Sequence, residues 1–202
     1  MASHRDMEYR LIESFGFKNV GEFNDMLQAT GAVIAGSAAL AMVAPIFEPA
    51  DMDIWIHSFS KKEDAHGHKA MTMLFKYFMG ANGYFQPILQ THNPSTEGYA
   101  SGKLHDVIAR IDRYINGRKV VQVIHTFVPV ADAIKAFDLS VCQISWNGRK
   151  LESPHMIDID SRICYIMHKT DPSTRELERI HKYIGRGFKL HGHYKEPEPE
   201  IM

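Results

Sequence analysis

Apolar side chains recur along the chain with two different periods, and the alternation between these periods predicts an α/β order of elements. In residues 6–29 the apolar positions fall three or four residues apart in two groups, which predicts two amphipathic helices. A short apolar run over 32–35 predicts a buried strand that breaks at Gly36-Ser37 and continues as a short helix over 38–42. A second strand is predicted from Asp51 to Ile56.

The rest of the chain continues the pattern with a hairpin at its centre. Asn116-Gly117 lies between two β-type runs and is a strong signal for a tight hairpin turn. In chain order we predict a helix over 62–79, a strand over 84–90, a long polar loop over 91–103, hairpin strands over 107–114 and 120–126, a short helix over 129–136, a strand over 137–146, a short returning strand over 149–152, and helices over 161–168 and 173–188. The apolar residues of the strand over 137–146 cannot all share one face, so we expect either a bulge or burial of both faces near Gln143.

The last predicted helix carries two distinct faces. Ser173 and Glu176 stand at the spacing of an N-terminal capping box. Basic and apolar residues separate to opposite faces, namely Arg175, Arg179, Lys182 and Arg186 against Leu177, Ile180, Ile184 and Phe188. The basic face is either a solvated surface of a helix packed on the core, or a surface that contacts a triphosphate or a nucleic-acid backbone.

Composition limits the classes of protein to consider. The 202 residues suit one domain, which we place at 1–192, with a small helical C-terminal extension over about 155–192 and a flexible acidic tail over 193–202. The net charge of −1 gives no bulk signal for nucleic acid, so any such surface must be local. Two cysteines make no disulfide framework, and no apolar run reaches transmembrane length, so we expect a soluble cytoplasmic protein with no membrane partner.

Histidines are numerous but do not form a metal-binding pattern. The His-Gly-His triplets at 66–68 and 191–193 have a loop-like composition, and no Cys/His spacing typical of zinc is present. We interpret these triplets as surface residues or adventitious metal binders.

Candidate chemistry concentrates around the first two strands. Alternate residues of a strand face the same side, so Asp51 and Asp53 point together and repel each other unless a cation compensates them. The Gly36-Ser37 turn enters a helix, whose free N–H groups suit a phosphate. Together these features suit a metal-bound nucleotide, although the acids could also be a solvated strand edge and the turn only a tight turn with an N-cap.

A third carboxylate completes the pattern. A two-metal phosphoryl-transfer site uses three acids, and Asp138 supplies the third if its strand neighbours that of Asp51 and Asp53. Gly36-Ser37, thirteen intervening residues, Asp51-Met52-Asp53-Ile54 and the later Phe137-Asp138-Leu139 are similar to the motif of the DNA polymerase β-like nucleotidyltransferase superfamily. The motif covers residues 32–56 and 137–146, and its gap after Gly36-Ser37 is long for the family.

The resemblance implies a fold, an activity and a set of site residues. The expected fold is α/β (α+β), a nucleotidyltransferase-like mixed sheet flanked by helices, without room for a large second lobe. The expected activity is transfer of NMP from an NTP to a hydroxyl acceptor such as RNA, a protein or a small molecule, with release of pyrophosphate. Asp51, Asp53 and Asp138 would be catalytic and would bind Mg²⁺ or Mn²⁺; Gly36, Ser37, Arg179 and Lys182 would bind the nucleotide. The alternative is an inactive module of the same fold that binds nucleotide, RNA or a protein partner.

Overall fold

The computed structural model describes residues 4–57, 65–81, 83–84, 106–167 and 172–193. Its helices are α1 (His4–Ser14), α2 (Val20–Thr30), α3 (Ser37–Ala41), α4 (Ala65–Lys76) with a π-helical turn η1 (Tyr77–Ala81), α5 (Val130–Lys135), a 3₁₀ turn η3 (Ser140–Cys142), α6 (Met156–Asp160) and α7 (Thr174–Gly185). Its strands are β1 (Val33–Ala35), β2 (Asp51–His57), β3 (Ile108–Asn116), β4 (Lys119–Thr126), β5 (Ser145–Trp146), β6 (Leu151–Glu152), β7 (Ile163–Ile166) and β8 (Lys189–His193). None of the described helices is long and apolar enough to cross a membrane.

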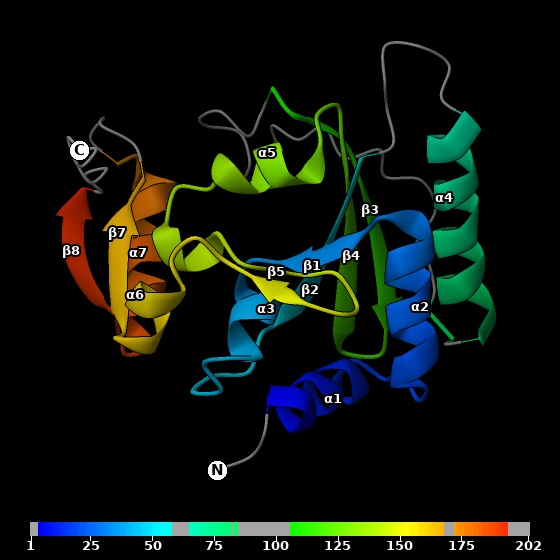
Figure 1. Cartoon of the computed structure of the whole chain (residues 1–202), viewed down its shortest axis with the longest axis horizontal. Helices are drawn as coiled ribbons and strands as arrows, with labels where there is room; N and C mark the ends of the chain where they lie inside the picture. Colours follow the sequence, from blue (N-terminus) through cyan, green and yellow to red (C-terminus); the bar gives the residue numbers. More distant parts are fainter. Residues whose placement is uncertain (1–3, 58–64, 82, 85–105, 168–171, 194–202) are drawn as a thin grey trace, which may run out of the picture.

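A six-stranded mixed sheet forms the centre of the molecule, with the strand order β3-β4-β2-β1-β5-β6 (Figure 1). β2 and β4 are parallel, and the other neighbours in this sheet are antiparallel. This confirms the predicted mixed sheet and the predicted hairpin, whose strands β3 and β4 turn at Gly117. A parallel neighbour needs a crossover connection, which here includes α4 and β3.

One face of the sheet is apolar and is covered by helices. Met52 pairs with Val121, which pairs with Tyr114, so these three side chains share a face. The ring of Tyr114 lies 4.7 Å from that of Phe78, at the end of the α4 segment. α2 and α4 stand side by side over this end of the sheet (Figure 1). Asn19 caps the start of α2, and Gly31 ends it in the left-handed conformation.

The C-terminal part contains helices, as in the predicted helical extension, and, in addition, two strands that were not predicted. α6 and α7 pack with a second, two-stranded sheet in which β7 and β8 run parallel, and in Figure 1 this unit lies at the end of the molecule opposite α4. The predicted helix over 161–168 is wrong, because residues 163–166 form β7. The second His-Gly-His triplet lies in β8 and the first in α4, so neither is a loop.

The predicted strand over 137–146 is also wrong for most of its length. Leu139 makes an isolated bridge to Ile166 of β7, and the 3₁₀ turn η3 follows before the two-residue strand β5. Leu139 therefore pairs with the C-terminal unit instead of continuing as a strand of the central sheet. The bulge, one of our two alternatives near Gln143, is replaced by this complete break. The predicted loop over 91–103, nearly all of the strand over 84–90 and almost all of the acidic tail lie outside the described residues.

The faces of α7 are also rotated from the prediction. Its capping box at Ser173 is present as predicted. Ile180 and Tyr183 are buried, whereas Leu177 and Ile184, assigned to the apolar face, are exposed. Arg179, which we assigned to the basic face, is partly buried and pairs with Asp138, so part of the basic face points toward the body of the protein.

Candidate active site

The turn between β1 and α3 depends on a glycine. Gly36 has φ of 66° and ψ of −136°, a conformation that L side chains rarely adopt, and its N–H donates to the carbonyl of Ile144 at 3.2 Å. A Cβ on Gly36 would also contact the ring of Phe137 at 4.0 Å. The following α3 has only five residues, and Ser37 at its start is buried. The turn is therefore rigid, but its helix dipole is weaker than that of a long helix.

Asp51 and Asp53 lie at the start of β2, on the sheet face opposite the one covered by α2 and α4. The two residues are two positions apart in a regular strand, so they share this face. Gln122 of β4 is in register with Asp53 and donates from its Nε2 to Oδ2 of Asp51 at 3.4 Å. Arg113 of β3 is in register with Gln122 and is exposed on the same face. The acid pair thus has an amide neighbour and a cationic side chain one strand further.

Asp53 is poorly compensated. Its Oδ1 is shielded from solvent and has no hydrogen-bond partner among the described residues. Burial, followed by repulsion from Asp51, raises the pKa of Asp53 to about 8, and the positive charge of Lys182 acts in the opposite direction. A shielded carboxylate oxygen beside a second carboxylate is an arrangement that a divalent cation would stabilise, because hard cations prefer oxygen ligands.

Asp138 lies close to this face but has a partner of its own. The preceding Phe137 packs on Trp55 of β2, with 5.0 Å between the ring centroids. Oδ2 of Asp138 accepts hydrogen bonds from Nε and Nη2 of Arg179 at 2.9 and 2.6 Å. Burial disfavours the charge of Arg179, yet the neighbouring Asp138 carboxylate outweighs it and raises the pKa of Arg179.

We predicted that Asp138 lies in a strand next to the strand of Asp51 and Asp53, and this prediction is wrong. β2 lies between β1 and β4, and Asp138 belongs to neither strand. Among the residues that the structure describes, no three His, Cys, Asp or Glu side chains form a group that could hold a metal ion. A ligand role for Asp138 therefore stays a prediction.

α7 places its basic residues in different settings. Lys182 is exposed and close enough to affect the pKa of Asp53, and Arg179 binds Asp138. Arg186 instead stacks on Phe47, with the guanidinium carbon 3.7 Å from the ring centroid, and thereby fixes the loop before β2. Arg175 is exposed.

Gln122 and Arg113 are the site residues that sequence reasoning did not identify. Neither belongs to a motif: Gln122 reaches Asp51 through the register of β2 and β4, and Arg113 lies one strand further, on β3. The sequence predicted a strand over 120–126, but it did not show that this strand would pair with β2 and so place Gln122 beside Asp51.

The fold is similar to that of solved structures of other enzymes. One such structure, "Thermotoga maritima CCA-adding enzyme complexed with tRNA_CCA", matches 91% of this chain at 10% identity with a TM-score of 0.52. A "tRNA-processing enzyme (apo form I)" matches 89% at 14% identity with a TM-score of 0.54. No protein-family model and no curated protein sequence matches the chain.

These likenesses establish the class of fold. The fold is the mixed α/β type found in the structure of the CCA-adding enzyme, and the mixed sheet flanked by helices agrees with the sequence prediction. The chain spans 42–43% of the length of the two solved structures, and the identities are low.

Proposed function

We propose that this protein transfers a nucleoside monophosphate from an NTP to a hydroxyl acceptor, with Asp51 and Asp53 holding a magnesium or manganese ion. The observation that carries the proposal is the shielded Oδ1 of Asp53, which has no hydrogen-bond partner in the described part of the chain and lies beside Asp51, in a fold similar to that of a CCA-adding enzyme. When bound there, a divalent ion would neutralise the triphosphate and polarise its α-phosphate.

The chain's own residues have separate roles in this proposal. In this proposal the triphosphate binds the first backbone N–H groups of α3, since the N–H of Gly36 itself is bonded to the carbonyl of Ile144, and Lys182 adds a positive charge near Asp53. The acceptor hydroxyl gives up its proton to water and its oxygen forms a bond to the α-phosphorus. The bond between the α-phosphorus and the oxygen that bridges to the β-phosphate breaks, so pyrophosphate leaves with that electron pair. Arg179 occupies Oδ2 of Asp138, which leaves Oδ1 to accept a hydrogen bond from the acceptor hydroxyl.

The test is incorporation of α-labelled NTP into acceptors with magnesium and with manganese. RNA acceptors come first, because one similar structure is a complex with tRNA. Asp51→Asn and Asp53→Asn should each lower the chemical step by about 10²-fold or more, as for other groups that stabilise developing charge. Asp132→Asn is the matched control, because Asp132 is an exposed acid paired only weakly with Lys135 at 3.6 Å. Equal turnover by Asp53→Asn and wild type would contradict the proposal.

A second candidate function is nucleotide binding without turnover. It is favoured by the amide of Gln122 at the strand position beside Asp51 and Asp53, and by the engagement of Asp138 with Arg179. In this case wild type and Asp53→Asn would both bind NTP and would both be inert across RNA, protein and small-molecule acceptors. Absence of NTP binding by either protein would contradict both candidates.

A further inference from the structure

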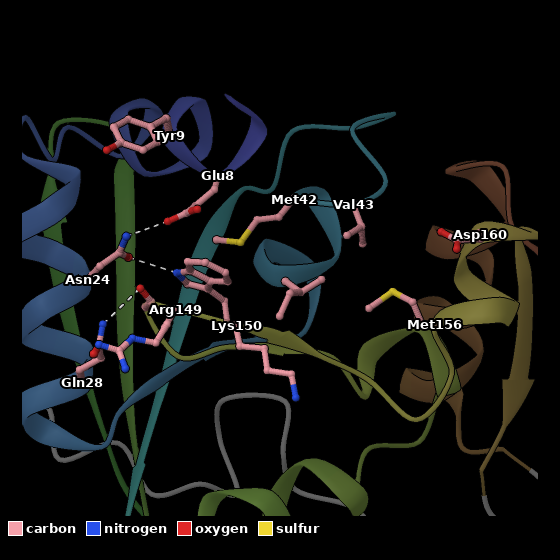
Figure 2. A pocket seen from close by; sticks show the side chains of 13 residues that line it. Glu8, Tyr9, Asn24, Gln28, Met42, Val43, Arg149, Lys150, Met156 and Asp160 are labelled. Atoms are coloured by element: carbon pink, nitrogen blue, oxygen red, sulfur yellow. Dashed lines mark hydrogen bonds between the residues drawn. The ribbon is translucent and has the colours of Figure 1, made fainter. Parts of the chain in front are cut away.

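A well-formed hollow on the described surface lies away from the acid pair. It has a volume of about 710 Å³ and is formed by α1, α2, the end of α3, the β5–β6 turn and α6 (Figure 2). Ile34 pairs with both Ile54 and Trp146, so the Trp146 side chain shares the face of Ile54. Asp53 projects from the opposite face. The hollow is therefore a site separate from the candidate active site.

Its walls are held in place by polar contacts. Trp146 donates from Nε1 to Oδ1 of Asn24 at 3.1 Å, and Asn24 donates from Nδ2 to Oε1 of Glu8 at 2.7 Å (Figure 2). Gln28 donates to the carbonyl of Gly148 at 3.3 Å. A Cβ at Gly148 would stand 2.5 Å from the carbonyl oxygen of Asn24, so only glycine lets the β5–β6 turn approach α2 this closely. The hollow is thus preformed, which reduces the entropy cost of binding.

Its chemistry changes from one part to the next. The apolar wall consists of Trp146, Met42, Val43, Leu151 and Met156, and the ring of Tyr9 is about half exposed at its border. Glu8 is a buried carboxylate, only 6% exposed. Arg149 and Lys150 are exposed basic residues on the β5–β6 turn, and Asp160 lies on the α6 side.

We propose that this hollow binds a nucleotide whose base presents N–H donors, with guanine as the best match. A flat ring would pack against Trp146 and the two thioethers. Glu8 already accepts a hydrogen bond from Asn24, and because a carboxylate has about four lone-pair sites it can also accept from the adjacent N–H groups on one edge of guanine. Arg149 and Lys150 would bind the phosphate.

Two features shape the expected affinity. Lys150 pairs with Glu152 at 2.8 Å, but both side chains are more than half exposed, so a phosphate can compete for this cation. Asp160 repels a phosphate, which favours placement of the phosphate toward Arg149 on the turn. A volume of about 710 Å³ lies within the range of small-molecule sites, so a mononucleotide fits with room to spare.

The experiment uses the full chain and GMP, with EDTA present so that binding does not depend on a divalent ion. The Trp55→Phe variant leaves Trp146 as the sole tryptophan, so its fluorescence reports the hollow directly. We expect a saturable fluorescence change, with Kd confirmed by calorimetry. Glu8→Gln should weaken GMP binding at least about tenfold, which corresponds to ~1.4 kcal/mol. Arg149→Ala with Lys150→Ala should weaken it about tenfold and flatten its salt dependence.

Matched controls separate this site from the acid pair. Lys189→Ala removes an exposed basic residue from β8, and Asp51→Asn alters the opposite face of the sheet. Neither should change the GMP signal. Guanosine should bind more weakly than GMP, and orthophosphate alone should bind far more weakly.

Three outcomes would overturn the proposal. The first is no fluorescence change or heat up to millimolar GMP. The second is binding that survives Glu8→Gln and the double variant at the turn but changes with Asp51→Asn, which would place the nucleotide at the candidate active site. The third is equal binding of orthophosphate, which would reduce the hollow to an anion site. Because the readout needs no turnover, failure of the proposed NMP transfer would leave this test intact.

Discussion

Two carboxylates on opposite faces of the same sheet have opposite environments. Asp112 of β3 is bound by Nε and Nη2 of Arg110 at 2.6 and 2.7 Å and lies 3.0 Å from Nε2 of His125. Burial acts to raise the pKa of Asp112, but the bonds to His125 and Arg110 outweigh it and lower that pKa. Asp53 has a shielded oxygen without a described partner and a pKa of about 8.

The difference shows which carboxylate serves stability. A buried charge with complementary partners supports the folded state, whereas one that faces another acid costs free energy in the absence of a cation. A position that disfavours its own charge is typical of functional sites. The contrast therefore separates a structural acid from a candidate ligand more clearly than exposure does, since both residues are largely covered.

The largest expected effect belongs to the structural acid. Asp112→Asn should lower the free energy of unfolding by about 2–3 kcal/mol at pH 7, because Arg110 and His125 lose their charged partner. Urea denaturation measures this change, and Asp132→Asn, at a 58% exposed side chain, should change stability by less than about 0.5 kcal/mol. A loss no greater than that of the control would assign Asp112 no stabilising role.

The stability difference between wild type and Asp112→Asn should depend on pH. A lowered pKa in the folded state means that the stabilisation is present above the ordinary value of 3.8 and is lost as the pH falls through the folded-state pKa. The stability difference between wild type and Asp112→Asn should therefore shrink in acid. A difference that grows in acid would contradict the direction of the shift.

The acid pair should respond in the opposite sense. In EDTA at pH 9, Asp53→Asn should raise the free energy of unfolding by about 1–2 kcal/mol, because it removes an uncompensated charge. Since the folded-state pKa is about 8 against an ordinary 3.8, the penalty in wild type grows as the pH rises between these values and is complete above about 8. The gain should vanish near pH 4, as thermal unfolding across pH will show. Destabilisation by Asp53→Asn at pH 9 would mean that a partner compensates this charge.

A carboxylate added at position 122 tests whether the acid pair binds a cation. Gln122→Glu would place a third carboxylate beside Asp51 and should raise Mn²⁺ affinity about tenfold. Calorimetry in the absence of nucleotide measures this affinity. Gln122→Met, of similar size and without charge, is the control. Equal Mn²⁺ affinity in both variants would show that the side chain at this position does not reach the cation.

The smallest expected effect concerns the partial compensation of Asp53 by α7. Lys182→Ala should raise the pKa of Asp53 further, by a fraction of a pH unit, since Lys182 is exposed and screened by water. NMR titration of the carboxyl carbon measures this shift. Arg175→Ala, exposed on the same helix, should leave the pKa unchanged. A downward shift in Lys182→Ala would contradict the placement of Lys182 near Asp53.

Local signals predicted the centre of the fold well. The turn at Gly36, the strand from Asp51 and the hairpin at Gly117 each follow from residues within a few positions of one another. Backbone preference and strand alternation act at that range, so one sequence is sufficient. The same holds for the capping box of Ser173 and Glu176.

The C-terminal part was predicted poorly because its structure depends on distant partners. The sequence analysis placed residues 163–166 in a helix, although the composition Ile-Cys-Tyr-Ile favours a strand. In the structure these residues form a strand that pairs with β8. The bridge between Leu139 and Ile166 likewise joins residues that are distant in the sequence. We predicted that Asp138 lies in a strand, but in the structure it lies outside the strands. No residue near Gln122 in the sequence indicates that it lies beside Asp51.

The parallel contact between β2 and β4 also governs how the protein folds. Asp51 and Gln122 are 71 residues apart, and parallel strands cannot zip together from a tight turn. Closing so long a segment costs chain entropy before the ladder returns any bonding energy, so this step belongs to the slow part of folding. During synthesis, Asp51 and Asp53 leave the ribosome long before Gln122 does. The acid pair therefore acquires its neighbour on β4 only once most of the domain has been made.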